Sequence, residues 1–232
     1  MKAEVNIACV FWKGDFRGRD FCTQDVWHLY HSILKHIDRP FEFFVFTNQP
    51  SADLPGTVIE LKHSKEWVGW WSKMELFRPG ILPKRRTLYQ DLDSFIIRGL
   101  SPILDFEGDL VMWATPEAVK MKWIIKNGNT PAPLYRNSTM LFTPGEFTWL
   151  YEKFLQGYDY YINNVRGDQE LISMWLPNQP TFNSEWLLKL GTMELNPGYL
   201  QNPPQEAIII TGQPRSGLFR DMGRFPWFKE MA

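Results

Sequence analysis

The sequence has few of the residues that build disulfide frameworks or soft-metal sites. Its 232 residues include only 2 cysteines, Cys9 and Cys22, and 4 histidines, all of which precede Asp91. Two isolated cysteines provide neither a disulfide framework nor zinc-ligand spacing, and this composition is typical of a reducing cytoplasm. We therefore expect a cytoplasmic protein.

Long apolar runs and a dominant sign of charge are also missing. No segment approaches the roughly 18 apolar residues of a membrane-spanning helix, and the apolar part of MKAEVNIACVFW is too short for a signal peptide. With 25 Lys and Arg against 26 Asp and Glu, the formal net charge is −1, so no overall field attracts nucleic acid or an anionic membrane. The sequence has no GxGxxG, Walker lysine loop or GxSxG motif, which argues against the enzyme classes that carry them.

What the sequence does contain is an alternation of apolar runs and amphipathic segments. Val5 to Phe11 and Phe41 to Thr47 have the continuous apolar pattern of buried parallel strands, and Val26 to Ile37 between them has helical spacing. A chain of this length suits one domain with a substantial core. We predict one α/β domain with a mostly parallel central sheet flanked by helices. Lys120 to Pro133 is predicted to be a loop, because Asn127-Gly128-Asn129 is typical of a turn.

The most informative stretch is Arg86 to Leu100, with the sequence RTLYQDLDSFIIRGL. An apolar strand reaches Leu88 and Tyr89, and Asp91 and Asp93 follow it directly. Residues two apart in an extended chain point the same way, so both carboxylates can face one space. Two hard oxygen donors at the end of a strand suit a Mg²⁺ or Mn²⁺ ion that keeps positions open for water and phosphate. We predict a metal site here.

This strand, its Tyr-x-Asp-x-Asp motif and the hydrophobic run after it resemble the metal and nucleotide-sugar site of GT-A fold glycosyltransferases. The resemblance is to the family 8-like enzymes of bacteria and phages in particular, and it covers most of the chain in scattered short motifs. It implies one GT-A domain over residues 1–232, with a nucleotide-binding half at 1–100 and a sugar- and acceptor-binding half with a C-terminal tail at 101–232. It also implies a Mn²⁺ or Mg²⁺ cofactor and a hexosyl- or pentosyltransferase of the retaining type, in a bacterium or a phage-infected host.

The resemblance extends to residues near the transferred sugar. Tyr135 to Phe142 resembles the Asn-Ser-Gly strand beside the donor sugar, although Thr139 stands where glycine is usual, and Asn137 would read sugar hydroxyls. Asp168 and Gln169 open a predicted helix where such enzymes place groups near the anomeric carbon. The resemblance thus assigns catalytic roles to Asp168 and Asn137 and a donor contact to Gln169. Asp168 is also predicted to be the N-cap of the helix.

Four basic residues are candidate ligands of the donor phosphates. Lys13 and Arg17 lie in the loop after the first strand, and ligands of α/β sheets bind where strands end. Lys73 lies in a predicted helix at Glu66 to Gly80, in a region where the related enzymes carry a basic residue that contacts the donor. Arg215 follows the last predicted strand, and its planar guanidinium suits a bidentate phosphate contact.

The third metal ligand of the related enzymes has no counterpart here. These enzymes often carry a histidine near the position of Thr211, whereas every histidine of this chain precedes Asp91. The resemblance therefore implies that Thr211, Gln213 or water completes the coordination, or that the metal binds weakly.

The sequence leaves several functions open. We favour transfer from a nucleoside-diphosphate sugar, with UDP as the favoured nucleotide, to a hydroxyl of a glycan or of a modified nucleic-acid base. A nucleotidyltransferase acting on sugar phosphates could use the same site. A non-catalytic glycan-binding module would account for the aromatic content of 16%. For the acceptor, the near-zero charge argues against nucleic acid, whereas Arg215, Arg220 and Arg224 among the aromatic residues of the tail argue for it.

Overall fold

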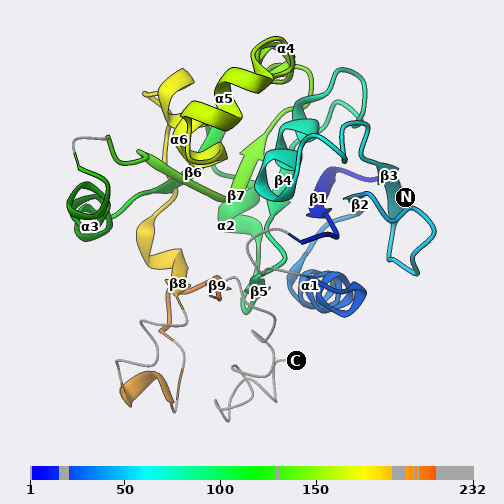
Figure 1. Ribbon diagram of the computed structural model, residues 1–232. Coiled ribbons are helices and arrows are strands. Elements are labelled where there is room, and N and C mark those ends of the chain that lie inside the picture. The colour runs from blue at the N-terminus through cyan, green and yellow to red at the C-terminus, as the bar shows by residue number, and fades with distance from the viewer. Residues whose placement is uncertain are drawn as a thin grey trace.

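The centre of the computed structural model is a six-stranded sheet with the order β3-β2-β1-β4-β7-β6 (Figure 1). The structure describes residues 2–15, 21–128, 131–189, 197–200, 202 and 204–212. The strands of this sheet are β1 (Val5–Phe11), β2 (Phe41–Thr47), β3 (Thr57–Glu60), β4 (Thr87–Gln90), β6 (Leu110–Ala114) and β7 (Tyr135–Phe142). β1, β2, β3 and β4 run parallel, whereas β7 is antiparallel to both β4 and β6. The prediction of a mostly parallel α/β sheet is confirmed, and strands from both predicted halves share it.

A second, three-stranded sheet brings the end of the described chain beside the acidic stretch. It has the order β5-β9-β8, made of β5 (Ser94–Ile96), β9 (Ile209–Thr211) and β8 (Leu187–Lys189). β5 pairs antiparallel with β9, so that Ser94 lies opposite Thr211. The backbone N–H of Gly212 donates a hydrogen bond of 2.7 Å to the carbonyl oxygen of Asp93. The chain after Asp93 is therefore held by residues that come much later in the sequence.

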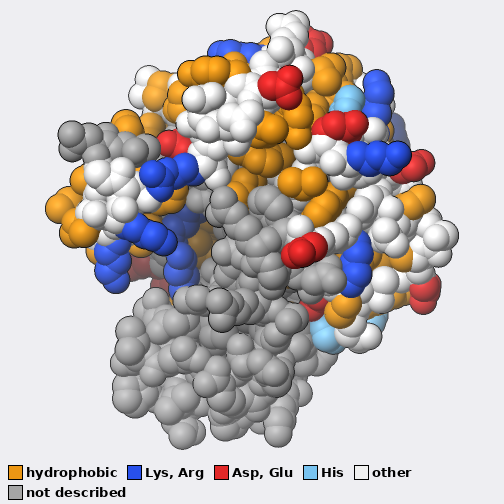
Figure 2. Space-filling view, viewed as in Figure 1, with side chains coloured by type: hydrophobic (Ala, Val, Ile, Leu, Met, Phe, Trp, Pro, Cys, Tyr) orange, Lys and Arg blue, Asp and Glu red, His pale blue; other side chains and the backbone are white. Residues whose placement is uncertain are grey.

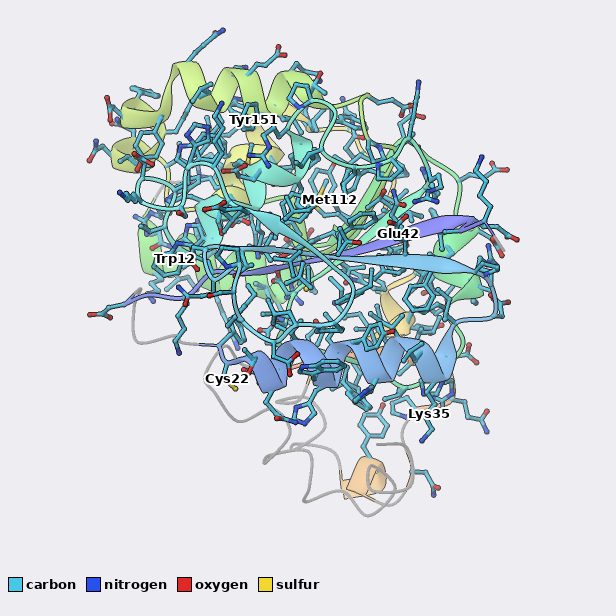
Figure 3. All side chains as sticks on the ribbon, turned by 90° about the vertical axis from the view of Figure 1, so that its right-hand side faces the viewer. Trp12, Cys22, Lys35, Glu42, Met112 and Tyr151 are labelled. Carbon is cyan, nitrogen blue, oxygen red and sulfur yellow. The ribbon has the colours of Figure 1, made fainter. Side chains whose placement is uncertain are left out.

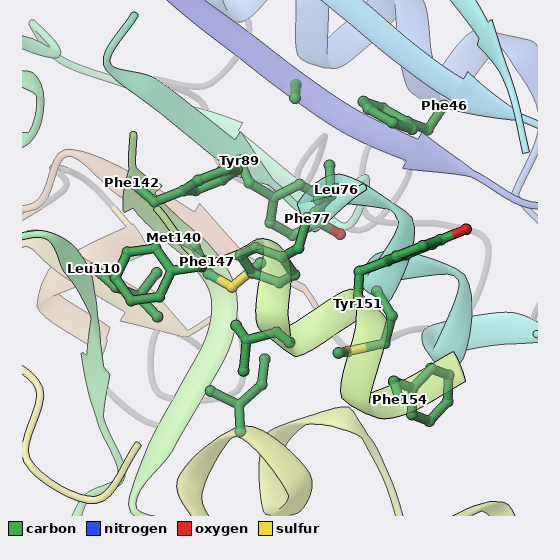
Figure 4. Packing of buried hydrophobic residues seen from close by; sticks show 14 of the residues in the cluster. Phe46, Leu76, Phe77, Tyr89, Leu110, Met140, Phe142, Phe147, Tyr151 and Phe154 are labelled. Carbon is green, nitrogen blue, oxygen red and sulfur yellow. The ribbon is translucent and has the colours of Figure 1, made fainter. Parts of the chain in front are cut away.

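Helices cover both faces of the central sheet and create two apolar cores. On one face lies α1 (Thr23–His36), which Figure 3 shows alongside the sheet. It buries Val26, Leu29 and Ile33, as its helical spacing predicts. The elements on the other face are η1 (Gly69–Phe77), α4 (Thr148–Gln156), α5 (Tyr158–Asn164) and α6 (Asp168–Trp175). Successive residues of β1 point to opposite cores, Ile7 toward α1 and Ala8 toward the other helices. Figure 4 shows the second core, where Phe77 and Phe142 meet with ring centroids 5.2 Å apart.

The remaining elements are short or peripheral, and one of them corrects a prediction. They are α2 (Ser101–Leu104), α3 (Glu117–Asn127), η2 (Ser184–Trp186) and η3 (Pro197–Leu200). The predicted loop at 120–133 is wrong over most of its length, because α3 occupies it as far as Asn127. α3 buries no residue, so no apolar stripe marked it in the sequence. The predicted turn survives as the end of this helix, where Gly128 has a φ of 66°.

The helix predicted at Glu66 to Gly80 is shorter in the structure and has 3₁₀ geometry, as η1 (Gly69–Phe77). Seven consecutive residues of η1 are buried, which an amphipathic helix of regular spacing does not allow. Among the described residues, no helix has the length and apolar character needed to cross a membrane.

Gly56, which directly precedes β3, provides a test of the packing at this edge of the sheet. It has a φ of 76°, and an added Cβ would lie 2.3 Å from the backbone oxygen of Phe43. Because this contact is with backbone, we expect Gly56→Ala to lower the free energy of unfolding by roughly 1–3 kcal/mol. The measurement is urea unfolding, with Gly99→Ala as the control, since nothing lies within 4 Å of a Cβ at Gly99. Equal midpoints for the two variants would contradict this account.

Candidate functional site

A pocket of about 380 Å³ lies where β1 and β4 end, and we call it the central pocket. Its lining includes Asp91 and Asp93 after β4, Lys73 from η1, and Asp168 and Gln169 from the start of α6. Binding sites of α/β sheets form at the carboxyl ends of the strands, because the loops there converge. Five of the residues predicted from the sequence are thus brought together in one place.

Lys73 joins the two acidic parts of the central pocket. Its Nζ lies 2.9 Å from Oδ1 of Asp91 and 3.3 Å from Oδ2 of Asp168. Burial lowers the pKa of Lys73, but the charges of Asp168 and Asp91 raise it by more, so the pKa lies above its ordinary value. Lys73 is therefore protonated, and it holds two carboxylates near each other that would otherwise repel. The hydroxyl of Tyr89 donates a further hydrogen bond to Asp91.

Asn137 lies behind this cluster instead of lining the central pocket. Its side chain is fully buried, its Nδ2 donates to Oδ2 of Asp168 at 2.6 Å, and its Oδ1 accepts a 3.5 Å hydrogen bond from Lys73. The predicted direct contact between Asn137 and sugar hydroxyls does not fit this position, because both ends of the amide are already engaged. The structure instead places Asn137 to orient Asp168.

The predicted N-cap role of Asp168 is wrong. The N-cap of α6 is Gly167, and Asp168 is the first residue of the helix. Its carboxylate turns inward to Lys73 and Asn137, which give this buried charge a cation and an amide donor. Asp168 is 4% exposed, and only this small part of the residue contributes to the lining of the central pocket.

The structure places the other predicted site residues less centrally. The side chain of Lys13 is exposed and does not line the central pocket, and its backbone exchanges two hydrogen bonds of 2.8 Å with the side chain of Asn48. Thr211, at the end of β9, does line this pocket. Arg17, Gln213 and Arg215, together with Arg220 and Arg224 of the tail, lie outside the described residues.

Arg136 and Lys189 also line the central pocket, and the sequence did not identify them. Within the described chain, no carboxylate lies within 4.0 Å of either side chain. Burial lowers the pKa of Arg136. Burial, followed by the charge of Arg136, lowers the pKa of Lys189 to about 8, against the opposing effect of Asp93. Two partly buried cations without a carboxylate partner suit an anionic ligand.

The residues of the central pocket fit a divalent cation in the chemistry of their donors. Asp91 and Asp93 supply hard carboxylate oxygens, which Mg²⁺ and Mn²⁺ prefer. Both oxygens of Asp91 also contact Nζ of Lys73, at 2.9 and 3.2 Å, so an ion there would share this carboxylate with the lysine. In the described ranges no third His, Cys, Asp or Glu joins them, so these side chains alone do not complete a coordination sphere. Such an ion would keep positions for phosphate and water, and the hydroxyl of Thr211 is a further oxygen at the same wall.

Comparison with known proteins finds similar structures but no similar sequences. No protein-family model matches the chain, and no curated protein matches it either. Among solved structures, the galactosyltransferase LgtC, in complex with donor and acceptor sugar analogues, matches 98% of this chain and 100% of its own with a TM-score of 0.62 and 11% identity. The glycosyltransferase GlyE of Streptococcus pneumoniae TIGR4 matches 90% of this chain and 55% of its own with a TM-score of 0.57 and 12% identity.

An active-site mutant of LgtC has nearly the same similarity, with a TM-score of 0.61 at 12% identity and 94% of each chain covered. Sequence identities this low carry no more than the fold. The chain has the GT-A fold of LgtC and resembles the family 8 type of glycosyltransferase in its architecture.

Proposed function

We propose that the protein is a metal-dependent glycosyltransferase that moves a sugar from a nucleoside-diphosphate sugar, with UDP as the favoured nucleotide, to a hydroxyl of an acceptor glycan. The observation that carries the proposal is the meeting of Asp91, Asp93, Lys73 and Asp168 in one pocket at the end of β4. LgtC, whose fold this chain shares, was solved with donor and acceptor sugar analogues. That likeness supports a nucleotide sugar and a glycan as the two substrates.

The transfer breaks the bond between the anomeric carbon and the diphosphate oxygen and forms a bond from that carbon to the acceptor oxygen. The proton of the acceptor hydroxyl leaves with the diphosphate or to solvent. A Mg²⁺ or Mn²⁺ ion held by Asp91 and Asp93 would act as a Lewis acid on the leaving group. Arg136 and Lys189 would bind the diphosphate as further positive charge, because both line the pocket and no described carboxylate lies within 4.0 Å of either.

Asp168 would act on the sugar side of the reaction. Lys73 and Asn137 hold its carboxylate, so little reorganisation is needed when positive charge develops on the anomeric carbon. Gln169 lines the same pocket and would contact the donor. We propose that the anomeric carbon keeps its configuration in the transfer, because the chain resembles the family 8 enzymes.

Incubation with UDP-sugars and Mn²⁺ tests the reaction class. Release of UDP together with free or transferred sugar would support glycosyl transfer. A parallel incubation with a nucleoside triphosphate and a sugar phosphate tests the alternative, and release of pyrophosphate there would identify a nucleotidyltransferase. Proton NMR of the fresh product reports the anomeric configuration. Sugar binding without dependence on nucleotide or metal would indicate a glycan-binding module instead.

The diphosphate role of Arg136 and Lys189 leads to a separate prediction. We expect Arg136→Gln and Lys189→Gln each to weaken UDP binding about tenfold, because each removes a charge-assisted contact to phosphate. Calorimetric titration with UDP and with uridine provides the measurement, and the affinity for uridine should not change. Lys84→Gln is the control, since Lys84 is exposed and lies outside the central pocket. An equal loss for uridine and UDP would show a general effect on the fold and contradict the assignment.

A further inference from the structure

A second pocket, of about 610 Å³, adjoins the central pocket, and we call it the α3 groove. It is lined by one side of α3, by the loop before α6 and by the first residues of α6. The two pockets share lining residues, among them Trp70, Trp123, Asp168 and Gln169. A molecule in the α3 groove would therefore lie next to Asp168, which also lines the central pocket proposed to bind the donor.

Positively charged side chains outnumber carboxylates in the lining of the α3 groove. Lys122, Lys126 and Arg166 line it, and its carboxylates are Asp168 and Glu170. Asp168 is bound to a lysine of the central pocket, and Glu170 accepts a 2.8 Å hydrogen bond from the backbone N–H of Arg166. In the part of the chain that the structure describes, no carboxylate lies within 4.0 Å of Lys122 or Lys126.

The two sides of α3 differ in residue type. Lys122 and Lys126, four residues apart on one side of the helix, line the groove. Met121, Ile124 and Ile125 are exposed on the other side, with Ile125 at 78% exposure. In Figure 2, hydrophobic side chains gather on the outer, left-hand side of the region of α3, and Lys and Arg side chains gather below it and to its right. Lys122 and Lys126 are themselves exposed, and they line the groove together with the half-buried Trp123, so the groove side of α3 combines positive charge with an aromatic ring.

Aromatic rings line the same groove. The guanidinium of Arg166 lies 5.8 Å from the ring centroid of Trp123 and donates a hydrogen bond to the side chain of Asn127, which ties the end of α3 to the start of α6. Trp70 lines the groove from η1. Flat rings suit the faces of sugars, whereas lysine and arginine suit phosphate. Both kinds of surface are present within one groove.

We propose that the α3 groove binds the acceptor and that the acceptor is a glycan bearing a phosphate group, an inference that rests on the proposed glycosyltransferase function. Lys122 and Lys126 bind the phosphate, and Trp123 and Trp70 contact the sugar that presents the hydroxyl toward Asp168. The size of the groove fits a few sugar rings, and the acceptor analogue bound to LgtC is a sugar, which favours a glycan over a nucleic acid.

The test compares glucose 6-phosphate with glucose and with inorganic phosphate as probes. Binding is measured calorimetrically in the presence of saturating UDP and Mn²⁺, so that the phosphate positions of the donor are already filled. The proteins are the full chain, Lys122→Gln/Lys126→Gln, and the matched control Lys120→Gln/Lys65→Gln, which removes the same charge. Lys120 is on α3 but pairs with Glu117 at 2.7 Å, and neither control lysine lines the groove. The affinity of each protein for UDP is measured separately.

We expect glucose 6-phosphate to bind more tightly than either other probe, and about tenfold more weakly to Lys122→Gln/Lys126→Gln, with the control and all UDP affinities unchanged. Equal affinity for glucose and glucose 6-phosphate, with UDP still bound, would overturn the groove assignment and leave the donor site standing. Absence of UDP binding in every protein would remove the proposed function and the acceptor role with it. If a deoxythymidine oligonucleotide binds more tightly than glucose 6-phosphate, and Lys122→Gln/Lys126→Gln loses this binding, the acceptor is a nucleic acid and the glycan assignment is wrong.

Discussion

Asp91→Asn/Asp93→Asn should abolish the metal dependence of UDP binding and slow sugar transfer by on the order of 10³-fold. The wild type should bind UDP much more tightly with Mn²⁺ than without it, because the two carboxylates hold an ion that neutralises the diphosphate. Asparagine keeps the size of each side chain and removes the charge that a divalent ion needs. Calorimetric titration of UDP with and without Mn²⁺ measures the binding, and release of UDP from UDP-sugars measures the rate.

The control for this variant is Asp53→Asn/Asp109→Asn, which changes the net charge equally at two exposed positions. It should bind UDP and Mn²⁺ as the wild type does. If the wild type binds none of UDP, GDP, CDP and TDP, or if Asp91→Asn/Asp93→Asn keeps the metal dependence, the donor site assigned to the central pocket is wrong.

Replacement of Lys73 by methionine should destabilise the protein by roughly 3–5 kcal/mol as well as remove activity. Lys73 is 9% exposed and is the cation between Asp91 and Asp168, so its loss leaves the buried carboxylate of Asp168 and the partly buried carboxylate of Asp91 without their cation. Methionine has a similar length, which limits the cavity that a smaller residue would leave. Chemical unfolding gives the change in free energy, and UDP titration reports on the site.

A second substitution separates this electrostatic effect from packing. Adding Asp168→Asn to Lys73→Met should recover part of the lost stability, because one of the two repelling carboxylates is removed. Lys65→Met, at an exposed position, controls for the loss of a lysine and should change stability by less than about 0.5 kcal/mol. Additive losses in the double variant would show that Lys73 does not act through the charge of Asp168.

Local patterns in the sequence were sufficient for the fold class and for the acidic pair. β1, β2 and β6 are buried strands whose apolar runs are visible without any tertiary information, and α1 carries its apolar stripe at helical spacing. Asp91 and Asp93 were recognisable because polar residues interrupt an apolar strand at its end. Each of these patterns involves residues only a few positions apart, so it can be recognised from the sequence alone.

The ion pairs and hydrogen bonds of the site were decided only by the tertiary structure. Lys73, Asp91 and Asp168 come from η1, the end of β4 and α6, and nothing in their spacing shows that one lysine bridges both aspartates. Asn137 was chosen for its hydrogen-bonding capacity, yet its complete burial turns it from a sugar contact into a support for Asp168. Such roles depend on burial and on long-range contacts, which residue types alone do not reveal.

The same reason explains the features that the sequence did not show at all. Lys189 lies on β8, a three-residue strand too short for a periodic signal, and it meets Arg136 of β7 only through the fold. α3 was missed because it buries none of its residues, whereas a sequence pattern identifies a helix by the stripe that it buries. By itself, the sequence determined the sheet, the first helix and the acidic strand end, since these follow from local hydrophobic patterning. The tertiary structure decided which distant charges meet in the central pocket and which side of α3 faces the groove, because those are properties of packing between elements.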